Sequence, residues 1–271
     1  MKSMHLHRGL WSVAAGMALG VAGCGGGGGG STPPPPPALA PTIQATVLSF
    51  PSGASPPGFV ASGFDSAAVV TIRDASTGAT ISSASVAING ISVPYVATNQ
   101  DYEAELSLAP GASVALTVTA GGSTFSASGT QFAAYPTITS PQAGATWSTQ
   151  NENTVTWSSV ATSGNSIYEL GVFDTTGQLV WPSNGAVQVV SPPTTSFAVP
   201  AGSVSAGSRL VLVGVTERIS IPNAAQLSGL VIAGFNFVPI SVASAAASPI
   251  ETPPASPSTR AWAVPLTRLV R

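Results

Sequence analysis

The chain has 271 residues, of which only 7% are charged, with 8 basic and 10 acidic side chains and a formal net charge of −2. This composition argues against a nucleic-acid partner, because phosphate binding needs clustered Lys and Arg. Both histidines, the one lysine, all three methionines and the single cysteine lie within residues 1–24. The rest of the chain therefore offers no imidazole for Ser-His-Asp or Cys-His catalysis, no Schiff-base lysine and no His or Cys ligand for zinc.

Residues 1–24 have the layout of a secretory signal. Lys2 and Arg8 precede an apolar run over residues 10–22, and small residues follow at a cleavage site. The run is too short for a permanent membrane-spanning helix, which needs about 20 apolar residues. It ends in Val21-Ala22-Gly23-Cys24. At every position this box resembles the aliphatic-small-small-Cys box of bacterial lipoprotein signal peptides.

That resemblance implies cleavage before Cys24, a thioether-linked diacylglycerol on its sulfur and an acyl chain on its new amino group. It also implies a Gram-negative cell, with the outer membrane as destination, because Gly25 stands where an Asp would change the sorting. Residues 24–40 contain a run of glycines and a run of prolines, which together make a flexible and then extended tether. We therefore predict a signal peptide at 1–23 and a lipidated tether at 24–40.

Residues 41–132 carry an all-β pattern. Short runs rich in Val, Ile, Thr and Ala alternate with turn residues, and no stretch shows sustained helical periodicity. Asn89-Gly90, between two such runs, is a strong hairpin signal. The expected strands span residues 42–50, 68–74, 84–89, 91–96, 101–108, 113–120 and 123–129. This series predicts a first β-sandwich of immunoglobulin-like size.

A second all-β unit is predicted over residues 137–242, after a short joint at 133–136. Its expected strands span residues 137–139, 154–158, 166–174, 179–181, 187–190, 195–199, 209–217 and 229–242. The predicted fold class is therefore all-β, with two consecutive immunoglobulin-like sandwiches. From residue 243 to 271 the chain is rich in Ala, Ser and Pro, and we expect a disordered tail because such a composition cannot bury a core.

The opening of the second unit carries a further resemblance. It reads Ile138-Thr139-Ser140-Pro141, then Gly144-Ala145-Thr146-Trp147, and continues to Val155-Thr156-Trp157. This is similar to the immunoglobulin-like modules of Ser/Thr-rich fungal cell-wall proteins. The resemblance covers about 20 residues and implies a fold, not an activity. The whole chain also resembles Gram-negative lipoproteins in which a Gly/Pro-rich tether precedes two such modules.

Three acids alternate along one expected strand. Asp101, Glu103 and Glu105 share a face, because alternate residues of a strand point to the same side. A hard cation would relieve their mutual repulsion. However, no Asp-x-Asp-x-Asp-Gly loop is present, and the favoured interpretation is a solvated strand face that discourages aggregation.

Four further acids belong to the second unit: Glu152, Glu169, Asp174 and Glu217. Two of them would serve as a glycosidase pair only if their carboxyl groups met about 5–9 Å apart. Nothing in their spacing indicates this, so surface charges are the favoured interpretation. No metal, cofactor or catalytic residue is predicted.

Three tryptophans are candidates for stacking against sugar rings. Trp157 lies in mid-strand and is predicted to belong to the core, and Trp147 is expected to pack under the first turn. Trp181 ends a strand just before the loop at 182–185, which makes it the candidate exposed aromatic and ligand-binding residue.

The sequence favours a non-catalytic envelope protein, held on the membrane by the lipid on Cys24. Its modules would present loops or a sheet edge to a protein partner in adhesion, assembly or scaffolding. The alternative is a carbohydrate-binding lipoprotein that takes peptidoglycan or a surface glycan through Trp181. A third hypothesis is a hydrolase with two carboxylates. An exposed Trp flanked by Asn or Asp would favour the glycan, whereas a buried Trp181 together with a flat apolar sheet edge would favour protein contact.

Overall fold

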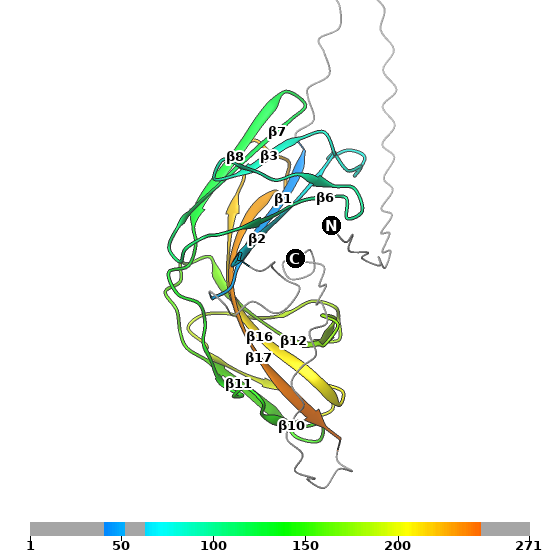
Figure 1. Cartoon of the computed structure of the whole chain (residues 1–271), viewed down its shortest axis with the longest axis vertical. Coiled ribbons are helices and arrows are strands. Elements are labelled where there is room, and N and C mark those ends of the chain that lie inside the picture. Colours follow the sequence, from blue (N-terminus) through cyan, green and yellow to red (C-terminus); the bar gives the residue numbers. More distant parts are fainter. Residues whose placement is uncertain (1–40, 52–62, 245–271) are drawn as a thin grey trace, which may run out of the picture.

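A computed structural model describes residues 41–51 and 63–244. These residues form an all-β structure with three sheets, which confirms the predicted all-β class. A ten-stranded sheet runs along the molecule, and a four-stranded and a three-stranded sheet lie on one side of it in a sandwich-like arrangement (Figure 1). The predicted signal peptide, tether and tail lie outside the described residues, as does Cys24.

The first part of the chain contributes strands to two facing sheets. In the large sheet lie β1 (Thr42–Ser49), β2 (Ser66–Arg73), β6 (Asp101–Leu106) and β5 (Tyr95–Val96), in this order. In the four-stranded sheet lie β4 (Ile91–Ser92), β3 (Ser85–Ile88), β7 (Ser113–Ala120) and β8 (Ser123–Thr130). The predicted Asn89-Gly90 turn is confirmed: both residues have positive φ, and the turn joins β3 to β4.

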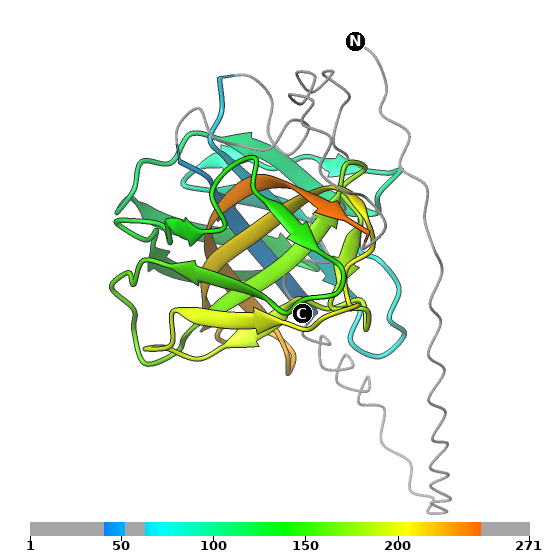
Figure 2. The ribbon, with the colours of Figure 1, turned by 90° about the horizontal axis from the view of Figure 1, so that it is seen from below.

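The second part repeats this division. The large sheet continues with β13 (Leu179–Trp181), β12 (Ser166–Asp174), β16 (Gly207–Ser220) and β17 (Gly229–Ala243), while β14 (Gln188–Val190) pairs with β12 and β10 (Thr146–Ser148) pairs with β17. The three-stranded sheet contains β15 (Ser196–Val199), β11 (Asn153–Trp157) and β9 (Ile138–Ser140). Figure 2 shows this part from below, with the strands of the two sheets facing each other.

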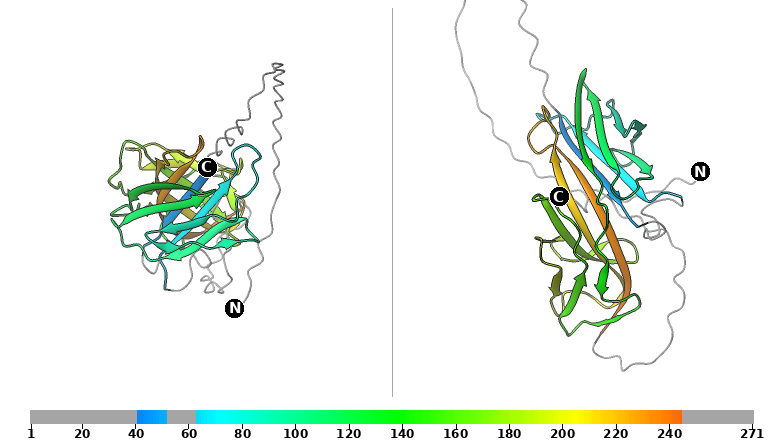
Figure 3. Two further views of the ribbon diagram at one scale, coloured as in Figure 1. Left: turned by 90° about the horizontal axis from the view of Figure 1, so that it is seen from above. Right: turned by 90° about the vertical axis from the view of Figure 1, so that its left-hand side faces the viewer.

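The long strands β16 and β17 connect the two parts. They pair with each other without interruption from Gly207↔Val242 to Ser220↔Gly229. The first half of β17 also pairs in parallel with β1, and its last residues pair in parallel with β10. Both strands extend over the two parts of the molecule (Figure 3, right). One continuous sheet therefore crosses the boundary at which the sequence predicts two separate sandwiches, and the division into two domains stays a prediction.

Two strand predictions were wrong. Residues 91–96 were expected to form one strand, but they form β4 and β5, which belong to different sheets. Pro94 lies between them and has no N–H for a ladder, so the chain crosses from one sheet to the other there. The other miss is β10, around Trp147, whose ladder is formed with residues far away in sequence at the end of β17.

The main core lies between the large sheet and the two small sheets. Along β16, alternate residues Val211, Val213 and Val215 are fully buried on this side, and β12 contributes Tyr168 and Leu170. This alternation is the period expected of a strand with one face in a core. The same cluster extends from the first part of the chain to the second, so the described residues share one apolar interior.

The joint between the two parts is packed against β17. The side-chain amide of Gln131 donates a 3.1 Å hydrogen bond from Nε2 to the carbonyl of Ala233. The ring of Tyr135 lies on Gly234, where a Cβ would approach its Cδ1 to 2.3 Å. A side chain at position 234 would displace the ring, so this glycine lets the joint contact the strand directly.

We expect Gly214→Ala to destabilise the protein. Gly214 lies in β16 under the Phe235 ring, and an added Cβ would come within 2.1 Å of two ring carbons that the core holds in place. Overpacking of this kind costs about 1–3 kcal/mol of the free energy of unfolding, measurable by chemical denaturation. Gly164→Ala is the matched control, because nothing lies within 4 Å of a Cβ there. Equal stability of the two variants would contradict the packing described.

Candidate functional site

The tryptophan that was predicted to be exposed is buried. Trp181 is only 6% exposed, and its ring centroid lies 5.7 Å from that of Phe197 in the space between the large and the three-stranded sheet. The expectation of a surface platform was therefore wrong, because tertiary packing turns the end of β13 inward. Trp147 and Trp157 are also buried, and Trp157 contacts Tyr168 edge to face, which confirms its predicted place in the core. None of these three rings offers a face to a sugar.

The row of acids on β6 is not uniformly solvated. Glu105 is exposed, as predicted, but Asp101 is 8% exposed and accepts a 2.7 Å hydrogen bond from the Thr71 hydroxyl. Between them, Glu103 is half-buried and accepts a 2.7 Å hydrogen bond from the side-chain amide of Asn99. Burial raises the pKa of Glu103, against the Asn99 hydrogen bond, and the Asp101 charge adds to the rise. Packing of β6 beside β2 brings Asp101 under cover, which sequence alternation alone cannot foresee.

The four acids of the second part do not converge. Glu152 is exposed before β11, and Asp174 ends β12, where its carboxylate accepts hydrogen bonds from the N–H groups of Thr176 and Gln178. Glu169 and Glu217 lie on opposite faces of the large sheet, because Glu169 meets Thr216, the residue beside Glu217 on β16. The described residues also hold no group of three His, Cys, Asp or Glu arranged for a metal ion.

Glu169 differs from the predicted surface charge, because it is 3% exposed. Its Oε1 accepts a long, 3.5 Å hydrogen bond from the Thr216 hydroxyl, and its Oε2 has no hydrogen-bond partner among the described residues. Burial raises the pKa of this carboxyl to about 8, although Thr216 works in the opposite direction. Glu169 is therefore mostly protonated at neutral pH, as a buried carboxyl without a cation must be.

Glu169 belongs to the face of the large sheet that points away from the two small sheets. This second face has its own apolar cluster, whose buried members are Leu48, Phe50, Ala67, Phe173, Leu210, Leu212, Ala233 and Phe235. The Phe50 and Phe235 rings lie 6.3 Å apart at its centre. All of these residues belong to the large sheet or, for Phe50, directly follow one of its strands, so the cluster is formed without the small sheets.

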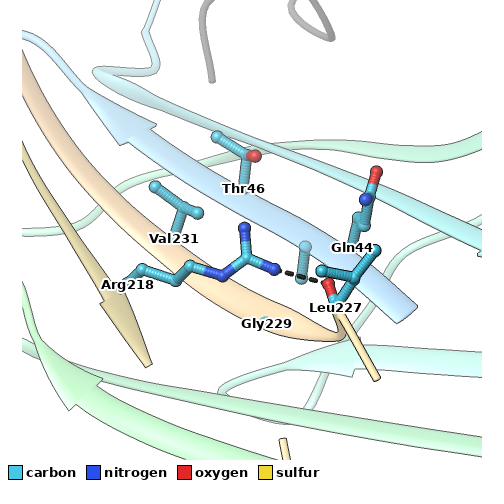
Figure 4. Close-up of a pocket in the computed structure, with 7 residues that line it drawn as sticks. Gln44, Thr46, Arg218, Leu227, Gly229 and Val231 are labelled. Atoms are coloured by element: carbon cyan, nitrogen blue, oxygen red, sulfur yellow. Dashed lines mark hydrogen bonds between the residues drawn. The ribbon is translucent and has the colours of Figure 1, made fainter. Parts of the chain in front are cut away.

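A groove opens on the same face at the end of the long strands. Arg218 lies along it between β1 and β17, and its Nη2 donates a hydrogen bond to the carbonyl of Leu227 at the rim (Figure 4). The volume of this groove is about 170 Å³, which is below the roughly 300–1,000 Å³ of ordinary ligand pockets. Because the guanidinium is already held by the chain and the groove is small, we do not assign a small-molecule site here.

Among the strands at the margins of the described sheets, β8 is the longest. It has eight residues and pairs with β7 alone, in an uninterrupted register. It contains no charged residue and no proline. The other strands at the margins of the described sheets, β4, β5, β9, β10, β13, β14 and β15, have two to four residues each. Short, charged or bulged edges prevent pairing between proteins, and β8 has none of these features.

The geometry of the β7–β8 hairpin shows which backbone groups of β8 point outward. Gly121 and Gly122 both have positive φ and form a two-residue turn, so Ala120 and Ser123 make its first hydrogen-bonded pair. Gln131 lies an even number of residues after Ser123, and its N–H donates to the carbonyl of Ala112. The odd-numbered residues of β8 therefore direct their backbone groups toward β7. The backbone groups of the intervening even-numbered residues therefore point away from β7. These residues, Thr124, Ser126, Ser128 and Thr130, are all exposed.

Comparisons with known proteins give likenesses of structure only. No protein-family model and no curated protein matches the chain. Among solved structures, the fibronectin(III)-like modules of Clostridium thermocellum CbhA align at 12% identity and a TM-score of 0.28, covering 77% of this chain and 99% of that one. The FN1-FN3 domains of chicken CNTN1 align at 14% identity and a TM-score of 0.23, covering 70% and 67%. The assignment of the all-β fold rests on the strands and sheets themselves.

We expect the free energy of unfolding to fall as the pH rises from about 4.5 through about 8, because folded Glu169 holds its proton more tightly than the unfolded chain does. The total change is a few kcal/mol, at about 1.4 kcal/mol per pKa unit. Glu169→Gln should flatten this dependence and make the protein more stable than the wild type at alkaline pH, measured by denaturant unfolding across this range. Glu152→Gln, at an exposed site, should leave the dependence unchanged. A wild-type slope in Glu169→Gln would refute the assignment.

Proposed function

We propose that this chain is a non-catalytic lipoprotein of a Gram-negative outer membrane, and that it contacts other proteins through its all-β units. The anchor is the lipid on Cys24, as the box Val21-Ala22-Gly23-Cys24 indicates. Residues 24–40 then separate the sheets from the bilayer. Among the described residues, no helix has the length and apolar character to cross a membrane.

One observation carries the protein-contact part of the proposal, namely the long uncharged edge of β8. Unpaired N–H and C=O groups along such an edge bind an extended strand of a partner through main-chain hydrogen bonds. The small exposed Ser and Thr side chains of β8 leave these groups accessible. Of the two features expected to favour protein contact over sugar binding, the burial of Trp181 is present, whereas the exposed side chains of the β8 edge are uncharged Ser and Thr and not apolar residues.

The burial of Trp181 removes the residue through which the glycan alternative would bind sugar. Sugar rings bind on exposed aromatic faces, but Trp147, Trp157 and Trp181 are each between 3% and 6% exposed. The hydrolase hypothesis needs two carboxyl groups in one cleft. Glu169 and Glu217 instead lie on opposite faces of the large sheet. The observations therefore favour contact with a protein.

Replacement of Cys24 by Ser tests the anchor. We expect the variant to leave the membrane fraction and to lack the mass of the diacylglycerol and the N-terminal acyl chain, because both modifications depend on this residue. Ser31→Ala, which lies in the same tether, should fractionate like the wild type. An unchanged mass and an unchanged membrane fraction for Cys24→Ser would show that the protein is not lipidated there.

A pull-down tests the contact edge. The full chain with Cys24→Ser is immobilised and exposed to solubilised envelope proteins and, in parallel, to peptidoglycan. We expect capture of a protein that is lost when Ser126 and Ser128 are both changed to Lys, because these charges lie on the exposed edge. Lysines at Ser85 and Ser92, exposed on β3 and β4 of the same sheet and not paired with β8, should not affect capture. Retention of peptidoglycan without edge-dependent protein capture would support the glycan alternative instead.

A further inference from the structure

The sequence of β8 is nearly symmetric about its centre. Residues 124–130 read Thr-Phe-Ser-Ala-Ser-Gly-Thr, so Thr and Ser recur at equal distances on both sides of Ala127. Only Phe125 and Gly129 break the symmetry. Two antiparallel strands with this sequence, aligned on Ala127, would place Thr opposite Thr, Ser opposite Ser and Ala opposite Ala.

We propose that β8 pairs with β8 of a second copy of this chain, antiparallel and centred on Ala127, to give a two-fold symmetric dimer with a continuous sheet. This inference rests on the proposed function, in which β8 is the contact edge, and it adds the identity of the partner. A two-fold contact uses the same patch on both copies, and a symmetric strand supplies such a patch by itself.

The backbone phase of β8 fits this register. The outward-pointing backbone groups belong to Thr124, Ser126, Ser128 and Thr130. An axis at Ala127 places Thr124 opposite Thr130 and Ser126 opposite Ser128, so the outward groups of one copy meet the outward groups of the other. An axis between two residues would instead set outward groups against groups that already bind β7. The centre of the sequence symmetry is thus also a centre that the hydrogen bonds allow.

The side chains fit as well. On the exposed face, Thr–Thr and Ser–Ser pairs across the axis are among the favourable cross-strand combinations. On the inner face, the axis brings Phe125 of one copy opposite Gly129 of the other. Gly129 has no side chain that would obstruct the ring. A side chain at this position would also collide with the core, because its Cβ would lie 2.3 Å from Cδ1 of Ile219. The absence of charge in β8 is a further requirement of self-pairing, since like charges would meet.

Charge exchange at the edge tests the dimer. The full chain with Cys24→Ser is studied by analytical ultracentrifugation over a concentration series. We expect a monomer–dimer equilibrium for the parent, and loss of the dimer when Ser126 and Ser128 are both Lys, because Lys then lies opposite Lys. The variant with Glu at both positions should also be monomeric. An equal mixture of the two variants should recover dimers, because Lys then lies opposite Glu.

The pair Ser85→Lys and Ser92→Lys is the matched control, since it adds the same charge to exposed positions of the same sheet on β3 and β4, neither of which pairs with β8. Circular dichroism of each variant verifies that it is folded. A monomeric parent at every concentration, or dimers that persist in the double-Lys variant, would overturn the inference. If the parent is monomeric but captures an envelope protein through the β8 edge, the self-pairing fails while the proposed function stands. If the mixture recovers dimers and no other protein is captured, the second copy is the partner.

Discussion

The uninterrupted pairing of β16 with β17 holds the two parts of the chain in one sheet. β16 pairs on its far side with β12, and β17 pairs on its far side with β1 and β10. Strands from the beginning, middle and end of the described chain therefore share one hydrogen-bonded ladder. Gln131 and Tyr135, which lie before and within the joint, contact this ladder at Ala233 and Gly234. Gly214 leaves room for the Phe235 ring, and Gly234 leaves room for the Tyr135 ring. A larger residue at either position would force one of these rings away from the strands.

The two faces of the large sheet have different chemistry. The face toward the small sheets contributes the apolar side chains of the main core. The opposite face combines an apolar cluster with polar groups, among them Glu169, the acids of β6 and Arg218. A carboxyl in such a place is neutral at the pH at which a surface acid is charged, because desolvation penalises the ionised form. Protonation of Glu169 is thus coupled to the stability of the sheet.

Several features could be read from the pattern of residues. Alternation of apolar residues over 113–118 and turn pairs such as Asn89-Gly90 depend on local backbone preferences, and the structure confirms the strands and the turn. The failures came where a distant partner decides the outcome. Trp147 lies in a strand only because the end of β17 lies beside it. Trp181 is buried because Phe197, from another sheet, lies across from it. The residues next to Trp147 and Trp181 in the sequence do not indicate either of these long-range contacts.

Strand period and turn chemistry are local properties, so the all-β class follows from the pattern of residues alone. The composition likewise shows that residues 25–271 contain no His, Lys or Cys. Contacts between distant segments explain why β17 pairs with strands of both parts of the chain, why Glu169 is buried, and why β8 lies at a margin of its sheet. An edge is defined by the neighbour that a strand lacks. The near-symmetry of residues 124–130 is present in the sequence. Only the hairpin geometry, which directs the backbone groups of the even-numbered residues away from β7, makes it relevant to pairing with another strand.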